Sequence, residues 1–370
     1  MSAAAAWSLG LARWAAELGR DLQRPVRALG GPRELWRVLR VDAATVARLC
    51  ALRADINPAR VRERLGAVGI VHISPGDARW PDALAALPDP PFGLFVRGDA
   101  DETLASLAAA PVVSLVGSRR ASARGRVFAH SLAGGLARAG AVVVSGLAYG
   151  IDAAVHEGVL SADGVTVAVL GCGVDVVYPR RHRALADRIM NRGLLMSEYW
   201  PGTPPAPWRF PARNRIVAGL AGAVGVIEAG ERSGALITAD FALEVGRPVL
   251  AVPGWPTDSG ARGCNALLRA GAALLEDRDD LIHELPGARW RVESPMGGIG
   301  PADDAHGLAG RILAALAREP LSADALGEQL GEGAATVAGT LAVLEVDGAV
   351  VRDDAQRYLV VPRAAPGVRQ

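Results

Sequence analysis

Arginines and small residues follow two apolar segments in the middle of this chain. The segment VVSLVGSRRAS ends in the turn Gly117-Ser118-Arg119-Arg120, and VVVSGLAYGID ends in the turn that begins Ser145-Gly146. A glycine turn that opens a helix exposes backbone N–H groups which, together with the helix dipole, favour an anion. Arg119 and Arg120 add charge-assisted donors. This pair of turns predicts phosphate binding, and the alternative is a plain strand-to-helix turn with solvated arginines.

A second candidate site is the segment RFPARNR, residues 209–215. Phe210 can stack on a nucleobase and the arginines, among them Arg213 and Arg215, can hold phosphates; together with Asn214 they have the parts of a site for single-stranded nucleic acid. Arginines in the first turn of a helix oppose the helix dipole unless an anion is bound there. This argument favours binding over the alternative in which Phe210 belongs to the core and the arginines decorate a helix.

Two further small-residue turns precede predicted helices, at Ser233-Gly234 and at Gly263-Cys264-Asn265. Several such turns at one edge of a sheet predict an extended track for anions, where a single nucleotide cofactor would need fewer. Asp152, in the first turn of its helix, is interpreted as a structural cap. His156 could pair with Asp152, although a surface histidine is the commoner outcome.

Motifs for several common chemistries are missing from the sequence. There is no GxGxxG followed by a ribose-binding acid, no GxxxxGK[ST], no pair of CxxC motifs, no HExxH and no GxSxG. We therefore expect no cofactor, no metal site and no catalytic residue. One enzymatic alternative stays open, a nucleotide-processing phosphoribohydrolase in which Glu228 or Glu231 would be the acid/base.

Strand and helix patterns alternate from Val112 to about Leu285, which predicts an α/β fold with a Rossmann-like, doubly wound, mostly parallel sheet. The two glycines of the first turns are 29 positions apart (146 − 117), close to the ~30 residues of one βαβ unit, so their strands should be neighbours. The predicted strands are 70–73, 94–96, 112–116, 142–145, 166–170, 194–196, 224–227, 249–252 and 273–275.

The sequence divides into four parts. Residues 1–68 are interpreted as a small helical module of the SAM or helix-hairpin-helix type, and 69–285 as the Rossmann-like DNA-binding core with its lead-in. Residues 286–304 have the composition of a linker, and 305–362 have the helix, helix, helix, hairpin order of a winged helix. The candidate recognition helix, 334–345, carries no basic residue, so an accessory role is favoured over reading duplex DNA.

The composition limits which partners the protein can bind and in which cellular compartment we expect it. The 370 residues carry a formal charge of +1, and all 40 basic residues are arginine, so a nucleic-acid role needs a local patch. Three widely spaced cysteines fit neither a disulfide framework nor a zinc site. No long uncharged apolar stretch occurs, and we expect a cytoplasmic protein without a membrane span.

With these residues in view, the chain resembles the family of DNA-processing protein A, DprA/Smf. The similarity rests on long motifs in the family order: GSRRAS, VVSGLAYGIDAAVHEG, TVAVLGCGVDVVYP, SEYWPGTPP, FPARNRIVAGL, IEAGERSGALITADFALEVGRPVLAVPG and RGCNALLRAGA. The resemblance implies a Rossmann-like core with a C-terminal winged helix, single-stranded DNA binding, homodimers, and loading of the RecA recombinase during natural transformation, without catalysis.

The resemblance also implies roles for individual residues. Gly117-Ser118-Arg119 corresponds to the family's phosphate-binding loop and Phe210 to the aromatic residue that contacts a base, with Arg213 to Arg215 and Ser233-Gly234 in motifs that line the same pocket. This chain departs from the family pattern at His182, where an asparagine is usual, and at Trp200, where a proline is common.

Overall fold

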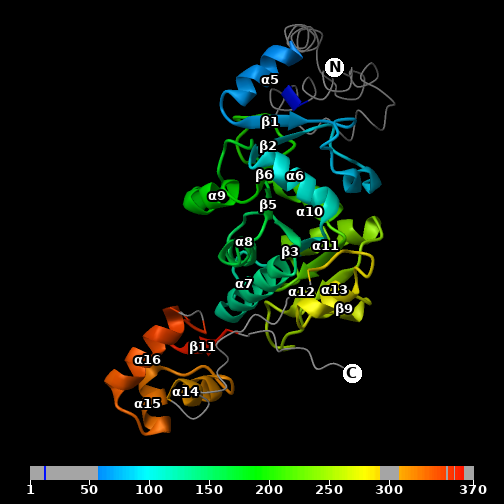
Figure 1. Cartoon of the computed structure of the whole chain (residues 1–370). Coiled ribbons are helices and arrows are strands. Elements are labelled where there is room, and N and C mark those ends of the chain that lie inside the picture. Colours follow the sequence, from blue (N-terminus) through cyan, green and yellow to red (C-terminus); the bar gives the residue numbers. More distant parts are fainter. Residues whose placement is uncertain (1–11, 14–56, 292–307, 347–348, 354, 362–370) are drawn as a thin grey trace.

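The computed structural model describes residues 12–13, 57–291, 308–346, 349–353 and 355–361 (Figure 1). Most of the predicted helical module lies outside these residues, as does most of the predicted linker, so those domain boundaries stay predictions. At the end of the module, α5 (Pro58–Gly66) has its proline at the first helical position. Its N-cap is Asn57, whose side chain accepts hydrogen bonds from the N–H groups of Ala59 and Arg60.

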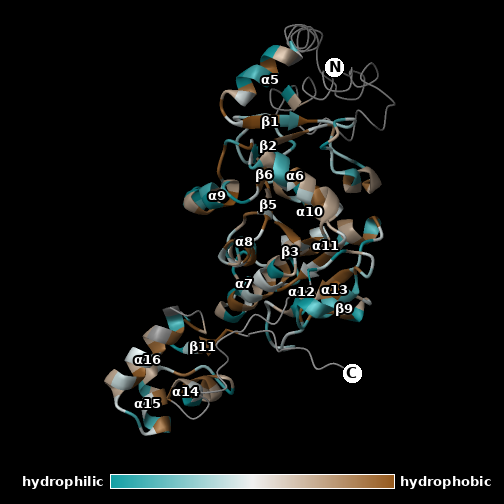
Figure 2. Ribbon diagram, in the orientation of Figure 1, coloured by the Kyte–Doolittle hydropathy of each residue, from teal (hydrophilic) through white to brown (hydrophobic). Residues whose placement is uncertain are grey.

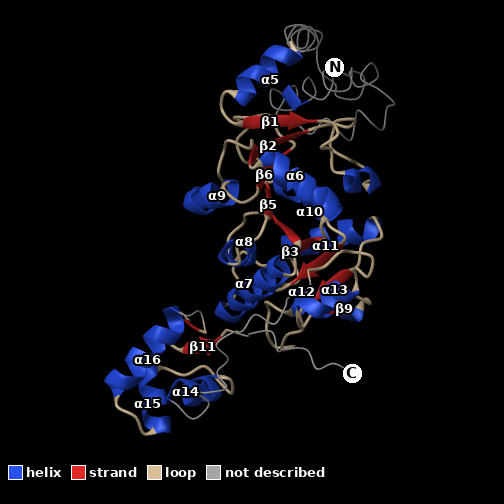
Figure 3. Cartoon of the chain, viewed as in Figure 1, coloured by secondary structure: helices blue, strands red, loops and turns tan. Residues whose placement is uncertain are grey.

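A nine-stranded sheet of order β1-β2-β6-β5-β4-β3-β7-β8-β9 forms the centre of the fold (Figure 3). The seven strands from β6 to β9 are parallel, and β2 and β1 continue the sheet in antiparallel pairing. Each strand lies within two residues of its predicted position, and the doubly wound, mostly parallel sheet is confirmed. The strands are β1 (Ile70–Ile73), β2 (Leu94–Gly98), β3 (Val112–Val116), β4 (Val142–Ser145), β5 (Thr166–Val169), β6 (Leu194–Ser197), β7 (Ala223–Val226), β8 (Val249–Ala251) and β9 (Ala273–Leu274).

Helices cover both faces of this sheet. Along β3, Val112 and Val116 pack with α10 and α11 on one face, whereas Val113 and Leu115 pack with α7 and α8 on the other. The strands at the centre of the sheet are apolar, as their mostly brown colour in Figure 2 shows, and the packing on both faces buries them. The helices are η1 (Asp82–Ala86), α6 (Ala100–Ala109), α7 (Ala123–Arg138), α8 (Ile151–Ser161), η2 (Arg180–His182), α9 (Arg183–Met190), α10 (Arg209–Leu220), α11 (Gly234–Glu244), α12 (Arg262–Arg269) and α13 (Arg278–His283).

The direction of winding reverses at β3. From β3 the chain moves outward through β4 and β5 to β6, then returns to place β7 on the other side of β3 and continues to β8 and β9. In open parallel sheets the loops at the carboxyl ends of the strands diverge at such a point and leave a crevice that binds ligands. This topology brings the predicted turns after β3, β4 and β7 to one place.

The C-terminal unit is a winged helix with a core of its own. Its elements are α14 (Leu308–Leu316), α15 (Ala323–Leu330), α16 (Ala334–Val346) and the hairpin β10 (Val350–Arg352) and β11 (Tyr358–Val360). Ser322 caps α15, and Gly331 ends that helix in the left-handed conformation. The order of elements predicted from the sequence is confirmed.

Candidate nucleic-acid pocket

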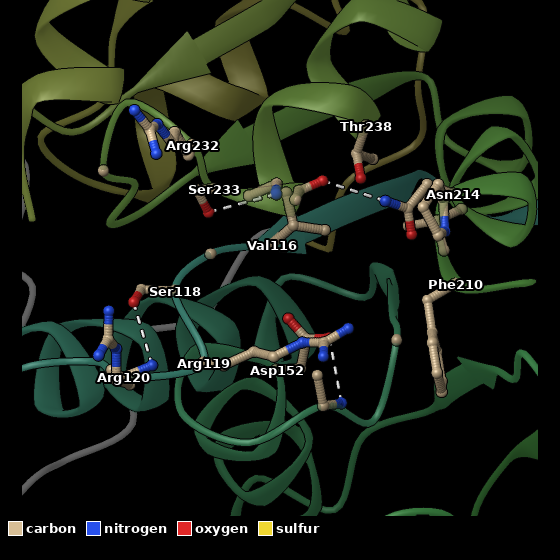
Figure 4. Close-up of a pocket in the computed structure, with 18 of the residues that line it drawn as sticks. Val116, Ser118, Arg119, Arg120, Asp152, Phe210, Asn214, Arg232, Ser233 and Thr238 are labelled. Carbon is tan, nitrogen blue, oxygen red and sulfur yellow. Dashed lines mark hydrogen bonds between the residues drawn. The ribbon is translucent and has the colours of Figure 1, made fainter. Parts of the chain in front are cut away.

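A cavity of about 740 Å³ lies at the carboxyl ends of β3, β4 and β7, where the winding reverses (Figure 4). Ten of the thirteen residues predicted to bind DNA line it, and Ser145, Arg215 and Asn265 do not. The ten are Gly117, Ser118, Arg119, Arg120, Gly146, Phe210, Arg213, Asn214, Ser233 and Gly234. The cavity is also lined by residues that sequence reasoning had not assigned to DNA, among them Arg232, Thr238, Ser259 and Gly260.

The turn after β3 holds an anion that belongs to the protein itself. The carboxylate of Glu228 accepts hydrogen bonds from the N–H of Ser122 (3.1 Å) and from its hydroxyl (2.7 Å), at the N-terminus of α7. The N–H of Ser118 donates to the carbonyl of Glu228 (2.6 Å), and that of Arg120 donates to the Ser118 hydroxyl (3.1 Å). The expected set of free backbone donors is therefore partly used inside the protein, and the side chains of Arg119 and Arg120 are what this turn offers to a ligand.

Arg213, from α10, lines the pocket and bridges the ends of two strands. Its Nη1 donates to the carbonyl of Gly146 (2.7 Å), beyond β4, and to the carbonyl of Val169 at the end of β5. The side chain is buried, and this burial lowers the pKa of Arg213 even though Asp152 lies near. A Cβ at position 146 would lie 2.5–2.7 Å from the guanidinium, so this position needs glycine for Arg213 to fit.

Asp152 is the carboxylate of the pocket. It lies in the first turn of α8, is buried, and accepts a hydrogen bond from the N–H of Ala148 (3.2 Å). Burial raises the pKa of Asp152, against the opposing effect of Arg213. The residue before α8 is Gly150 with φ of 78°, where a Cβ would clash with the Ser118 carbonyl. Asp152 thus orders the loop between β4 and α8, which agrees with a structural role.

Phe210 presents the aromatic surface of the pocket. The Arg119 guanidinium lies over its ring at 5.2 Å from the centroid, and the ring of Tyr178 lies 5.4 Å from it at an angle of 34°. Figure 4 shows Phe210 at one side of the cavity, with Arg119 and Asp152 beside it. Aromatic and guanidinium groups that stack on one another also stack on nucleobases, so this arrangement suits a flat ligand that carries negative charge.

The prediction that Arg213 and Arg215 lie in the first turn of a helix is wrong. Helix α10 begins at Arg209, and the guanidinium of Arg215, 4% exposed, donates through both terminal nitrogens to Glu198 at 2.6 Å. Burial opposes the charge of Arg215, but Glu198 outweighs this effect and raises its pKa. Arg215 also donates to the carbonyl of Asp89 (2.8 Å), so it holds α10 to neighbouring segments and lies outside the pocket.

Two other predicted binding residues serve the framework. The hydroxyl of Ser145 is buried and donates to the carbonyl of Leu115 (2.7 Å), which ties β4 to β3. The side chain of Asn265 donates to the carbonyl of Gly254 (2.8 Å) and accepts from its N–H (3.2 Å). Both residues therefore shape loops near the pocket without lining it.

His156 is not the surface residue that the sequence suggested. It is fully buried, and its Nδ1 lies 2.8 Å from the hydroxyl of Thr166, which itself donates to the carbonyl of Val143. Because that hydroxyl proton is used, His156 is the donor, and burial lowers its pKa to about 3. Its partner is Thr166 on β5, ten positions away, and the pairing with Asp152 that we considered does not occur.

The two residues that depart from the family pattern have ordinary contacts. His182 Nδ1 lies 3.0 Å from the carbonyl of Leu147 and its ring meets Tyr149 edge-on, while Trp200 packs edge-on against Phe95. Of the helices within the described ranges, none is long and apolar enough to cross a membrane.

Comparison with known proteins agrees with this architecture. The family model for DNA recombination-mediator protein A matches residues 71–286, and the model for the DprA winged helix domain matches residues 300–356. The chain is 41% identical over 309 residues to a putative DNA processing protein DprA of Mycobacterium tuberculosis, an alignment that covers 78% of this chain and 76% of the relative. It is 36% identical over 282 residues to the protein Smf of Escherichia coli, with 75% and 74% covered.

Two solved structures have the same fold. DNA processing protein A of Streptococcus pneumoniae superposes with a TM-score of 0.59 at 35% identity, covering 75% of this chain and 91% of that one. The protein of the same name from Helicobacter pylori, whose structure was described for its mode of binding single-stranded DNA, superposes with a TM-score of 0.53 at 30% identity and covers 59% and 96%. The chain belongs to the DprA/Smf family of DNA-processing proteins.

Proposed function

We propose that this protein binds single-stranded DNA in the pocket at the end of β3 and acts without catalytic turnover as a recombination mediator. The observation that carries the proposal is the composition of the pocket wall, in which Phe210 lies at one side against Arg119, while Arg120 and Arg232 lie at the other side. Among the described residues, these three arginines form no ion pair with an acidic side chain. Their guanidinium groups are therefore available to phosphate.

The contacts around Phe210 indicate how a strand would bind. Arg119 covers one face of the Phe210 ring. A base that stacks on this face takes the place of the Arg119 guanidinium, which can then pair with a phosphate of the same strand. Every base has a face that can stack, so such a site accepts many sequences. This mode of binding fits a protein that must hold incoming single strands of any sequence.

The enzymatic alternative has little support in the pocket. Glu228 is held by the N–H and hydroxyl of Ser122, and Glu231, 67% exposed, lies 3.6 Å from Arg262. Neither glutamate lines the cavity, and the one carboxylate that does so within the described part of the chain, Asp152, is buried and bonded to its own loop. A phosphoribohydrolase needs a carboxylate aimed at the ribose, and these contacts favour binding without hydrolysis.

The family relationship supports the rest of the proposal. On the basis of the family resemblance, we further propose that this chain protects incoming single strands and loads RecA recombinase onto them during natural transformation or recombination, as a cytoplasmic homodimer. Helix α16 (Ala334–Val346), the candidate recognition helix, carries no basic residue. The winged helix is accordingly proposed as an interaction module and not as a reader of duplex DNA.

Titration of a fluorescent 20-mer of deoxythymidine, by anisotropy at two salt concentrations, tests the proposal. The wild-type protein should prefer the single strand to a duplex of equal length, and Arg119→Gln should weaken binding about tenfold while its log–log salt slope falls in magnitude by roughly 0.7. Arg188→Gln, an exposed arginine of α9 outside the pocket, is the matched control and should bind as wild type. Equal affinity of the wild type and Arg119→Gln would place the DNA elsewhere.

The enzymatic alternative needs its own assay. The protein is incubated with each common nucleoside monophosphate, and the release of free base is followed by chromatography. We expect no release above the rate of a blank. Release that disappears on substitution of a pocket residue would replace the binding proposal by the enzymatic one.

A further inference from the structure

The loop between β8 and α12 exposes a tryptophan next to the pocket. Trp255 is 78% exposed, the highest value for a large apolar side chain among the described residues. A side chain of this size buries 150–250 Å² when it finds a partner, so its exposure leaves a large apolar surface in water. Nothing in the binding proposed so far uses this surface.

Hydrogen bonds give Trp255 a fixed place. The preceding residue, Gly254, is held at both its N–H and its carbonyl by the side chain of Asn265. The carbonyl of Trp255 accepts from the N–H of Asp258 (2.9 Å), and the Asp258 carboxylate accepts from the N–H of Gly260 (2.7 Å). The loop is therefore a closed, internally bonded turn that presents the indole, which argues against an unstructured tip.

The same loop borders the pocket. Ser259 and Gly260 line the cavity, and Asp258 directly precedes them. The bond between Trp255 and Asp258 closes a β-turn, so their Cα atoms lie within about 7 Å of each other. Nucleotides in a stacked strand are separated by roughly 3.4 Å, so a strand that leaves the pocket over this edge reaches Trp255 within a few nucleotides.

Cationic side chains lie along this path. The loop after β7 touches the loop after β8, since a Cβ at Gly230 would lie 3.1 Å from the carbonyl oxygen of Ser259. Arg232 belongs to the first of these loops and lines the pocket, and Arg262, 51% exposed, begins α12. Two acidic groups also lie nearby: Glu231 lies 3.6 Å from Arg262, and Asp258 accepts a hydrogen bond within its own turn and keeps its negative charge.

We propose that Trp255 is a second stacking platform for single-stranded DNA, on which a base rests after the strand has left the Phe210 pocket past Arg232. The inference rests on the proposed binding of single strands and extends it from one pocket to a path with an aromatic group at each end. An indole stacks on any base, and the arginines along the path hold the phosphates between the two platforms. The occupant is thus the flanking part of the same strand.

Anisotropy titrations of the full chain with two labelled 12-mers test this platform, one of deoxythymidine and one of abasic deoxyribose phosphate. Trp255→Ala should weaken binding of the thymidine 12-mer by about 5- to 150-fold, the effect of losing one stacked base, and leave its salt slope unchanged. The same variant should bind the abasic 12-mer as wild type does, because no phosphate contact is lost. Trp255→Phe keeps a stacking face and should recover most of the affinity.

The controls separate this inference from the proposed function. Val68→Ala, which shortens a 57% exposed apolar side chain far from the pocket in sequence, should change neither affinity. If the wild type binds and Arg119→Gln weakens binding while Trp255→Ala stays within twofold of wild type, the platform is refuted and the pocket stands. If the wild type binds neither oligonucleotide, the proposed function itself fails.

Sedimentation velocity on the same samples tests the alternative that Trp255 contacts a second copy of this chain. Trp255→Ala should sediment as the wild type does. A shift to a smaller species together with weaker DNA binding would show that Trp255 joins protein copies, and would overturn the platform. A cross-link from 5-iododeoxyuridine in the thymidine 12-mer to Trp255, located by mass spectrometry, would support it directly.

Discussion

Replacing Arg213 by glutamine distinguishes an arginine that holds the pocket together from one that holds DNA. The buried guanidinium bonds the carbonyls of Gly146 and Val169 and lies close enough to Asp152 to affect the pKa of both groups. Glutamine cannot span these partners and carries no charge. We expect Arg213→Gln to unfold more readily than the wild type, in addition to any loss of DNA binding.

The magnitude follows from what the substitution leaves unpaired. Removal of one partner from a buried charged pair costs about 3–5 kcal/mol, and each buried carbonyl left without a donor costs about 1–3 kcal/mol. Protonation of Asp152, whose pKa burial already raises, limits the first of these costs. With that first cost largely removed, the two unpaired carbonyls leave a total of about 2–6 kcal/mol, which for a domain of this size lowers the melting temperature by roughly 4–24 °C.

Thermal and urea unfolding followed by circular dichroism measure this change. Arg120→Gln, an exposed arginine on the rim of the same pocket, should melt within about 2 °C of wild type because it lies in water. The double variant Arg213→Gln with Asp152→Asn should recover part of the loss, because no unpaired carboxylate remains. If Arg213→Gln melts like the wild type yet binds single strands tenfold more weakly, the guanidinium contacts DNA and the structural assignment is wrong.

Three further outcomes are expected. Glu228→Ala should lower the unfolding free energy by about 1–2 kcal/mol through loss of the anion at the start of α7, a loss seen in urea titrations; unchanged stability would contradict this. Burial lowers the pKa of His72 to about 4 and of His156 to about 3. The free energy of unfolding is therefore unaffected by these histidines above pH 6.5, and it decreases at lower pH because the unfolded chain takes up protons that the folded chain does not. At pH 5 each histidine lowers the free energy of unfolding by roughly 2 kcal/mol. Asp152 acts in the opposite direction, because burial raises its pKa and the folded chain holds its proton more tightly. Urea titrations at pH 7 and pH 5 should show a smaller loss for His156→Gln than for the wild type. A chain that ends at residue 291 should keep its affinity for single strands, and its complete loss would assign DNA binding to the winged helix.

The fold and the position of the pocket could be predicted because they follow from local patterns. Runs such as VVSLV at 112–116 and VVVS at 142–145 are short, apolar and β-branched, and helices separate them, so a parallel sheet is the arrangement that buries them on both faces. Parallel strands that are joined by helices end at one edge, which brings the turns at Gly117, Gly146 and Ser233 together. Ten of the thirteen predicted residues line the cavity for this reason.

The partners of the buried polar groups could not be predicted, because they come from distant segments. An arginine in the sequence does not reveal whether its guanidinium meets a phosphate or a carboxylate of the same chain. Arg215 pairs with Glu198, the first residue after β6, and with the carbonyl of Asp89 from the lead-in to β2. His156 likewise finds Thr166 across the layer between α8 and β5. These pairings depend on packing and carry no local signal.

The position of Glu228 favours a strand over a nucleotide cofactor as the ligand that we propose for this pocket. In dinucleotide-binding folds the helix after the first strand holds the ligand's pyrophosphate at its N-terminus. Here the carboxylate of Glu228 occupies that place at α7 and repels a phosphate from it. The pocket is left with guanidinium groups on flexible side chains and with the ring of Phe210. Such groups bind phosphates and bases wherever a strand presents them, so affinity should depend on strand length and salt more than on the identity of one nucleotide.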